Sequence, residues 1–138
     1  WEPYSEAKLA ELQQQGRTVM LDFTAKWCVN CIANTNFALD TEPTRQLLEE
    51  LNAVAMLADW TDQDERIRRK LEELESQSIP LLAIYPGGNP DQPIILRDLV
   101  SQDTVLDALR QAGSSVNVAT IATKSQQDMI PEVASTTR

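Results

Sequence analysis

Residues 18–31 read TVMLDFTAKWCVNC, and this stretch decides the fold. Its first half, Thr18 to Thr24, is an apolar run of strand length that only Asp22 interrupts. Such a run predicts a strand covered on both faces, as in a parallel sheet. A helical pattern begins at about Cys28 and runs to Phe37. We therefore expect the two cysteines at the junction of a central strand and the helix that follows it.

Helical and extended patterns alternate on both sides of this stretch. The sequence predicts a helix from Ser5 to Gln15, which Ser5 caps and Gly16 ends. The other predicted elements are helices at 44–51, 62–77 and 101–113 and strands at 53–58, 81–85 and 94–96. Strands that alternate with helices predict a parallel core, and the last two strands add an antiparallel hairpin. The fold class is therefore α/β, with a central mixed sheet of about four strands flanked by helices and preceded by an N-terminal helix.

One domain accounts for most of the chain. Its 138 residues suit a single compact domain, which we place at residues 1–113. Residues 114–138 are rich in Ser, Thr, Ala and Gln, which predicts a flexible C-terminal tail, with a linker from a larger protein as the alternative. The chain starts at Trp1 without a methionine or an apolar leader. We therefore expect a mature or excised piece, with any export signal or membrane anchor outside it.

Composition excludes several classes of function. The chain has 21 acidic and 12 basic residues and a net charge of −9, which argues against nucleic acids and anionic membrane surfaces as partners. It has no histidine, so Ser/His/Asp and Cys/His catalysis and imidazole metal sites are excluded. The longest apolar run, Ala53 to Ala58, is far too short to span a bilayer.

The two cysteines, Cys28 and Cys31, form one C-x-x-C motif. At a helix N-terminus the thiolate is favoured over the thiol, so Cys28 is expected to attack a disulfide and Cys31, one turn later, to resolve it. A structural disulfide is one alternative, but closing a four-residue loop contributes only about 2 kcal/mol. Half of a zinc site is another, but zinc usually needs four such ligands and the chain supplies two. We favour a redox-active pair without a metal.

Three nearby residues bear on this chemistry. Burial of Asp22 would raise the pKa of its carboxyl, which could then take the proton of Cys31 during resolution. The alternative is that Asp22 lies near a solvated end of the strand and has no catalytic role. Lys26 could stabilise the Cys28 thiolate or remain a solvated lysine. Trp27 could shield the sulfur and contact partners, or it could serve packing alone.

Two further stretches are candidates for the same site. Pro80 opens a strand, where an ordinary trans proline is tolerated. Alternatively, a cis Ile79–Pro80 bond would expose backbone beside the cysteines for a partner strand. The cluster Asp59–Trp60–Thr61 favours a turn with helix capping, and a partner surface is the weaker interpretation.

Several of these stretches resemble one family. Residues 21–31, 58–61, 78–81 and 94–100 are similar to a thioredoxin-fold domain, and more narrowly to the C-terminal, extracytoplasmic domain of DsbD-type thiol:disulfide interchange proteins. The resemblance implies a three-layer thioredoxin-like fold, with Cys28 attacking, Cys31 resolving, Asp22 as the buried acid and Pro80 in cis. It also implies a periplasmic domain tethered to the inner membrane, with a link to cytochrome c biogenesis.

Three positions depart from the family's usual pattern. Ile32 stands where a basic residue is common, and Thr35 and Lys26 stand where acidic residues are common. Together they make the surroundings of the pair less acidic, which favours the thiolate of Cys28.

The sequence therefore predicts a protein-disulfide reductase without a cofactor other than the Cys28–Cys31 disulfide. Its expected partners are disulfide-bearing proteins and an upstream membrane-embedded thiol donor domain, and we expect a monomer. A disulfide oxidase or isomerase that uses the same pair is the first alternative. A peptide-binding module that uses the Pro80 groove is the second, although such a module has no use for a buried acid.

Overall fold

The computed structural model describes residues 1–117 of the chain. Its centre is a mixed sheet with the strand order β1-β3-β2-β4-β5. The strands are β1 (Glu2–Pro3), β2 (Val19–Thr24), β3 (Val54–Asp59), β4 (Leu81–Tyr85) and β5 (Ile94–Arg97). β1, β3 and β2 run parallel, whereas β4 and β5 are antiparallel to their neighbours. The prediction of about four strands missed β1, which has two residues, one of them a proline.

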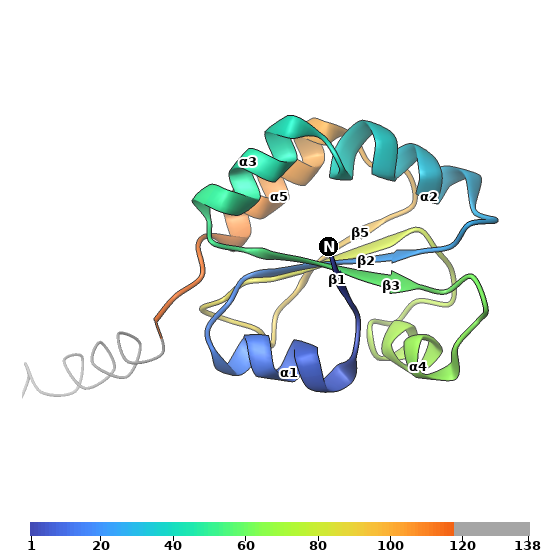
Figure 1. Cartoon of the computed structure of the whole chain (residues 1–138), viewed down its shortest axis with the longest axis horizontal. Coiled ribbons are helices and arrows are strands. Elements are labelled where there is room, and N and C mark those ends of the chain that lie inside the picture. The colour runs from blue at the N-terminus through green and yellow to red at the C-terminus, as the bar shows by residue number, and fades with distance from the viewer. Residues whose placement is uncertain (118–138) are drawn as a thin grey trace, which may run out of the picture.

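Helices cover both faces of the sheet and give three layers (Figure 1). They are α1 (Glu6–Gln14), α2 (Val29–Asn34), the π-helical turn η1 (Thr35–Leu39), α3 (Glu42–Glu50), α4 (Glu65–Glu73) and α5 (Gln102–Ala112). α1 and α4 lie on one face, and α2, η1, α3 and α5 lie on the other. The predicted α/β architecture is thus confirmed.

β2 is the middle of this core, because its side chains are buried on both faces. Leu21 and Phe23 pack in the cluster that includes α1 and α4, and Met20 packs in the cluster that includes α3 and α5. Successive side chains of a strand point to opposite faces. The unbroken apolar run in the sequence follows directly from this double coverage.

Two helices differ from their predicted extents. The helix predicted at 62–77 is shorter, since Asp64 caps it and it ends at Glu73. The helix predicted from Cys28 to Phe37 is divided into α2 and η1 at Thr35. The Thr35 hydroxyl donates to the Cys31 carbonyl at 3.0 Å, a back-bond that is typical of bends in helices.

Residues that follow α5 contact the domain. The Ser115 N–H donates to the Leu51 carbonyl at 2.8 Å, and the Ser115 hydroxyl accepts from the Thr18 N–H at 2.8 Å. Val116 donates to the Gly16 carbonyl at 2.7 Å. Residues 115 and 116 are therefore hydrogen-bonded to the domain, and residues 118–138 of the predicted tail lie outside the described part of the chain.

Candidate active site

The two cysteines form a disulfide at the junction of β2 and α2. Cys28 is the N-cap of α2, and its Sγ accepts from the Cys31 N–H at 3.2 Å. The exposed fraction is 9% for Cys28 and 2% for Cys31. Cys28 is therefore the more exposed of the two cysteines.

Asp22 lies on β2, six residues before Cys28. Its side chain is 4% exposed, and burial raises the pKa of its carboxyl to about 7. Its partners in the sheet are Leu57 and Leu82. Within the described residues no hydrogen bond or ion pair reaches the carboxyl, so burial alone raises its pKa. Because Asp22 alternates with Leu21 and Phe23, it points to the face of the sheet that α2 covers (Figure 1).

The Ile79–Pro80 peptide bond is cis, as the family resemblance implied. Ile79 packs against the cluster of Ala25, Cys28 and Cys31. The Pro80 carbonyl accepts from the Asp98 N–H at 3.0 Å. The structure therefore places Ile79 against the cysteine pair, with Pro80 as the next residue of the chain.

Lys26 and Trp27 lie on the surface immediately before Cys28. The ammonium group of Lys26 has no ion-pair partner among residues 1–117. The Trp27 side chain is 53% exposed, and its indole Nε1–H donates to the Thr61 carbonyl at 3.0 Å. Its ring lies 6.1 Å from the ring of Trp60. Trp27 is thus fixed on one side and open on the other.

Sequence reasoning missed the asparagines that hold α2 in place. Asn34, 5% exposed, donates to the Asp98 carbonyl at 2.9 Å and accepts from the Val100 N–H at 3.0 Å. Asn30 donates to the Asp98 carboxylate at 3.1 Å. These bonds join α2 to the loop between β5 and α5. The signal in the sequence was a polar residue, Asn34, on the buried face of a predicted helix.

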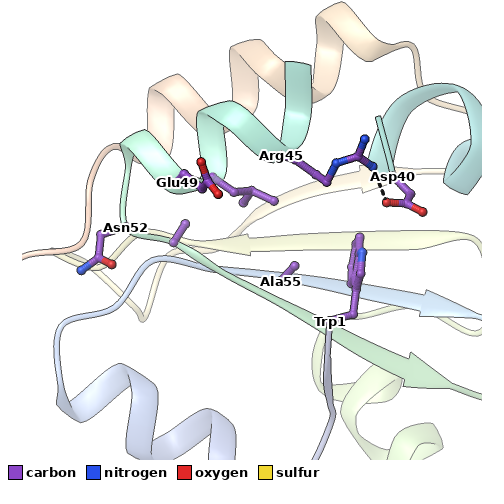
Figure 2. Close-up of a pocket in the computed structure, with 8 residues that line it drawn as sticks. Trp1, Asp40, Arg45, Glu49, Asn52 and Ala55 are labelled. Carbon is purple, nitrogen blue, oxygen red and sulfur yellow. Dashed lines mark hydrogen bonds and ion pairs between the residues drawn. The ribbon is translucent and has the colours of Figure 1, made fainter. Parts of the chain in front are cut away.

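A pocket of about 430 Å³ lies between α3 and the start of β3, and Figure 2 shows residues that line it. The Arg45 guanidinium points to Asp40 across it, at 2.8 Å, and Trp1 stands at its side. None of the predicted site residues lines this pocket. In the chain, Cys28 lies between the exposed side chains of Trp27 and Val29.

Residues 1–117 lack two features that would indicate other kinds of site. No helix in this range is long and apolar enough to cross a bilayer. No group of three or more Cys, Asp or Glu side chains in the same range could hold a metal ion.

The chain is similar to several known proteins. The thiol:disulfide interchange protein DsbD of Vibrio cholerae is 30% identical over 110 residues, which cover 78% of this chain and 18% of that protein. DsbD of Pseudoalteromonas atlantica is 45% identical over 58 residues, which cover 41% of this chain and 9% of that protein. The chain thus spans less than a fifth of these two relatives.

Solved structures share the fold. The C-terminal domain of Neisseria meningitidis DsbD in the oxidised form has a TM-score of 0.64 and 18% identity, covering 81% of this chain and 99% of that chain. A thioredoxin from Thermus thermophilus has a TM-score of 0.63 and 23% identity, covering 80% and 85%. A family model described as thioredoxin-like matches residues 1–87. That match covers more than half of the chain and includes Cys28, Cys31 and Pro80, so the chain belongs to the thioredoxin-like family.

Proposed function

We propose that this chain is a thiol:disulfide oxidoreductase that reduces disulfides of partner proteins through Cys28 and Cys31. One observation carries the proposal. Cys28 lies at the N-cap of α2, more exposed than Cys31, and Ile79 packs against the pair. In this proposal Cys28 is the nucleophile, Cys31 is the resolving thiol, and the backbone at Ile79 faces the partner.

The reduction proceeds in two exchanges. The Cys28 thiolate attacks one sulfur of the partner disulfide, forms a mixed disulfide and releases one partner thiolate. The Cys31 sulfur, as a thiolate, then attacks the Cys28 sulfur, which releases the second partner thiol and leaves the Cys28–Cys31 disulfide. Two electrons and two protons pass to the partner. A dithiol donor must reduce the Cys28–Cys31 disulfide before the next cycle.

Asp22 is proposed to assist the second exchange. Cys31 must lose its proton to attack, and Asp22 faces the side of the sheet on which Cys31 lies. A carboxyl with a pKa of about 7 is partly ionised near neutral pH and can accept and return a proton. This role distinguishes the chain from a peptide-binding module of the same fold.

The surface around Cys28 supports a protein partner. Trp27, Val29 and Ile32 are exposed apolar side chains close to it in sequence. The DsbD relatives support a dithiol donor in a membrane-embedded domain, disulfide-bearing acceptors and a periplasmic location. Lys26 is proposed to stabilise the Cys28 thiolate, and no cofactor is required.

The reduction potential tests the direction of exchange. We expect a value of about −230 to −270 mV after equilibration with dithiothreitol or glutathione, with Trp27 fluorescence as the readout. A value of about −120 to −180 mV would indicate an oxidase or isomerase instead. A pair that exchanges with neither reagent would reject redox function and favour the binding module.

A further inference from the structure

We propose that Thr61 is a positioning residue: together with Asp59 it fixes Lys26 and Trp27, which form the surface that a partner protein contacts when it reaches Cys28. The proposal rests on the thiol–disulfide exchange described above and deepens it, because it assigns a role in partner recognition to the Asp59–Trp60–Thr61 loop. The sequence favoured turn and capping roles for this loop and left a partner surface as the weaker alternative.

Thr61 holds both residues that precede Cys28. Its hydroxyl Oγ1 accepts from the Lys26 N–H at 3.0 Å. Its carbonyl accepts from the indole Nε1–H of Trp27 at 3.0 Å. One residue on the β3–α4 loop therefore fixes the backbone before Cys28 and the side chain beside it.

Asp59 fixes Thr61 in turn. The Asp59 carboxylate accepts from the Thr61 N–H at 3.0 Å and from the Thr61 hydroxyl. A hydroxyl has one proton to donate, and here it goes to Asp59, so Oγ1 presents a lone pair to the Lys26 N–H. The carboxylate thus makes Thr61 Oγ1 the acceptor in its hydrogen bond with the Lys26 N–H, and this bond holds the segment before Cys28.

The loop is also tied to the sheet. The Trp60 N–H donates to the Thr24 carbonyl at 2.7 Å, just beyond the last paired residues of β2 and β3. The Trp60 ring packs against the Trp27 ring at an interplanar angle of 54°. Trp27 is held by a hydrogen bond and a ring contact, yet it is 53% exposed.

This arrangement has a consequence for partner binding. An aromatic side chain that is already fixed loses little conformational entropy when a partner packs on its free face. Loss of the Thr61 hydroxyl would remove its bonds to the Lys26 N–H and to Asp59 and so loosen the segment. Part of the partner's binding energy would then go into ordering it. A small disulfide, which does not cover Trp27, would be reduced as before.

Thr61→Val tests this, because valine keeps the β-branched shape and removes only the hydroxyl. Thr61→Ser retains the hydroxyl and should rescue the effect. Thr41→Val is the matched control, since it removes one threonine hydroxyl that is bonded to Thr44 at the start of α3. Insulin serves as the protein disulfide and hydroxyethyl disulfide as the small one. Hydrogen exchange of the Trp27 indole and the Lys26 amide in the oxidised protein is measured by NMR.

For Thr61→Val we expect kcat/KM for insulin to fall roughly tenfold through a higher KM, about the effect of one lost hydrogen bond. The rate with hydroxyethyl disulfide should stay within about twofold, and both N–H groups should exchange faster. Thr61→Ser and Thr41→Val should match the unchanged chain. Unchanged exchange of both N–H groups, or an equal fall with both disulfides, would overturn the proposal.

Two further outcomes are also decisive. If the unchanged chain reduces neither disulfide, the proposed function fails, while the exchange of the indole and amide protons still decides whether Thr61 holds the segment. If Thr61→Val does not fold, Asp59→Asn replaces it, because it weakens the acceptor of both the Thr61 hydroxyl and the Thr61 N–H. Faster exchange of both N–H groups in Asp59→Asn would support the proposal, and unchanged exchange would refute it.

Discussion

Replacement of Asp22 by Asn should stabilise the fold at neutral pH and leave it nearly unchanged in acid. Burial raises the pKa of this carboxyl from 3.8 to about 7. The folded chain therefore binds a proton that the unfolded chain has lost between these two values. The contribution of the Asp22 carboxyl to the free energy of unfolding is fully present below pH 3.8 and is lost as the pH rises to about 7.

The pKa values set the size of the effect. Each pKa unit corresponds to about 1.4 kcal/mol, so the full shift corresponds to roughly 4 kcal/mol. Asparagine cannot ionise and has nearly the same shape. The advantage of Asp22→Asn should therefore grow by up to roughly 4 kcal/mol between pH 4 and pH 8.

Urea unfolding of both oxidised proteins from pH 4 to pH 8 measures this difference. The oxidised state keeps the cysteines from titrating, and all other carboxyl groups are common to both proteins. A difference in unfolding free energy that stays constant across this range would refute the burial argument.

In the reduced protein, the same substitution should slow resolution of the mixed disulfide more than the first attack, which quenched-flow trapping with iodoacetamide can separate.

Other expectations concern the pair and its supports. Cys31→Ala should accumulate a mixed disulfide with a partner on a non-reducing gel, whereas Cys28→Ala should form none; a stable adduct of Cys28→Ala would reverse the assigned roles. Asn34→Ala should lower the free energy of unfolding by about 2–4 kcal/mol, because buried Asn34 is lost and part-buried groups of the loop between β5 and α5 lose their partners. Exposed Asn30→Ala should cost under about 1 kcal/mol; equal losses in urea unfolding would contradict this. Ser115→Ala should cost about 1–3 kcal/mol by the same measurement, because it leaves a part-buried N–H unpaired, and no loss would show that water replaces the bond.

The parts of the fold that sequence predicts well are those fixed by local pattern. The run around Leu21 and Phe23 is apolar because β2 is buried on both faces. The local apolar pattern is therefore enough to predict this strand. β1 is not, since Glu2 and Pro3 become a strand only by pairing with Met56 and Leu57. Tertiary contact, not propensity, creates that element.

The site divides in the same way. Cys28, Cys31 and Pro80 stand out by residue type and spacing, and burial of Asp22 follows from the strand that contains it. The role of Thr61 could not be predicted, because its bonds to Lys26 and Trp27 cross 35 and 34 residues. A single sequence does not show which distant backbone group a threonine hydroxyl will bond.

The topology explains why these distant segments meet. β2 and β3 run parallel, so Thr24 and Asp59 end their strands at the same edge of the sheet. β4 runs antiparallel to β2, so its first residues, after Pro80, lie at that edge too. The cysteine turn, the Asp59–Thr61 loop and the cis-proline turn are therefore brought together by strand direction alone. Under the proposed function, a site assembled from three loop ends would meet the exposed disulfide of a folded partner at Cys28 without a pocket that encloses it.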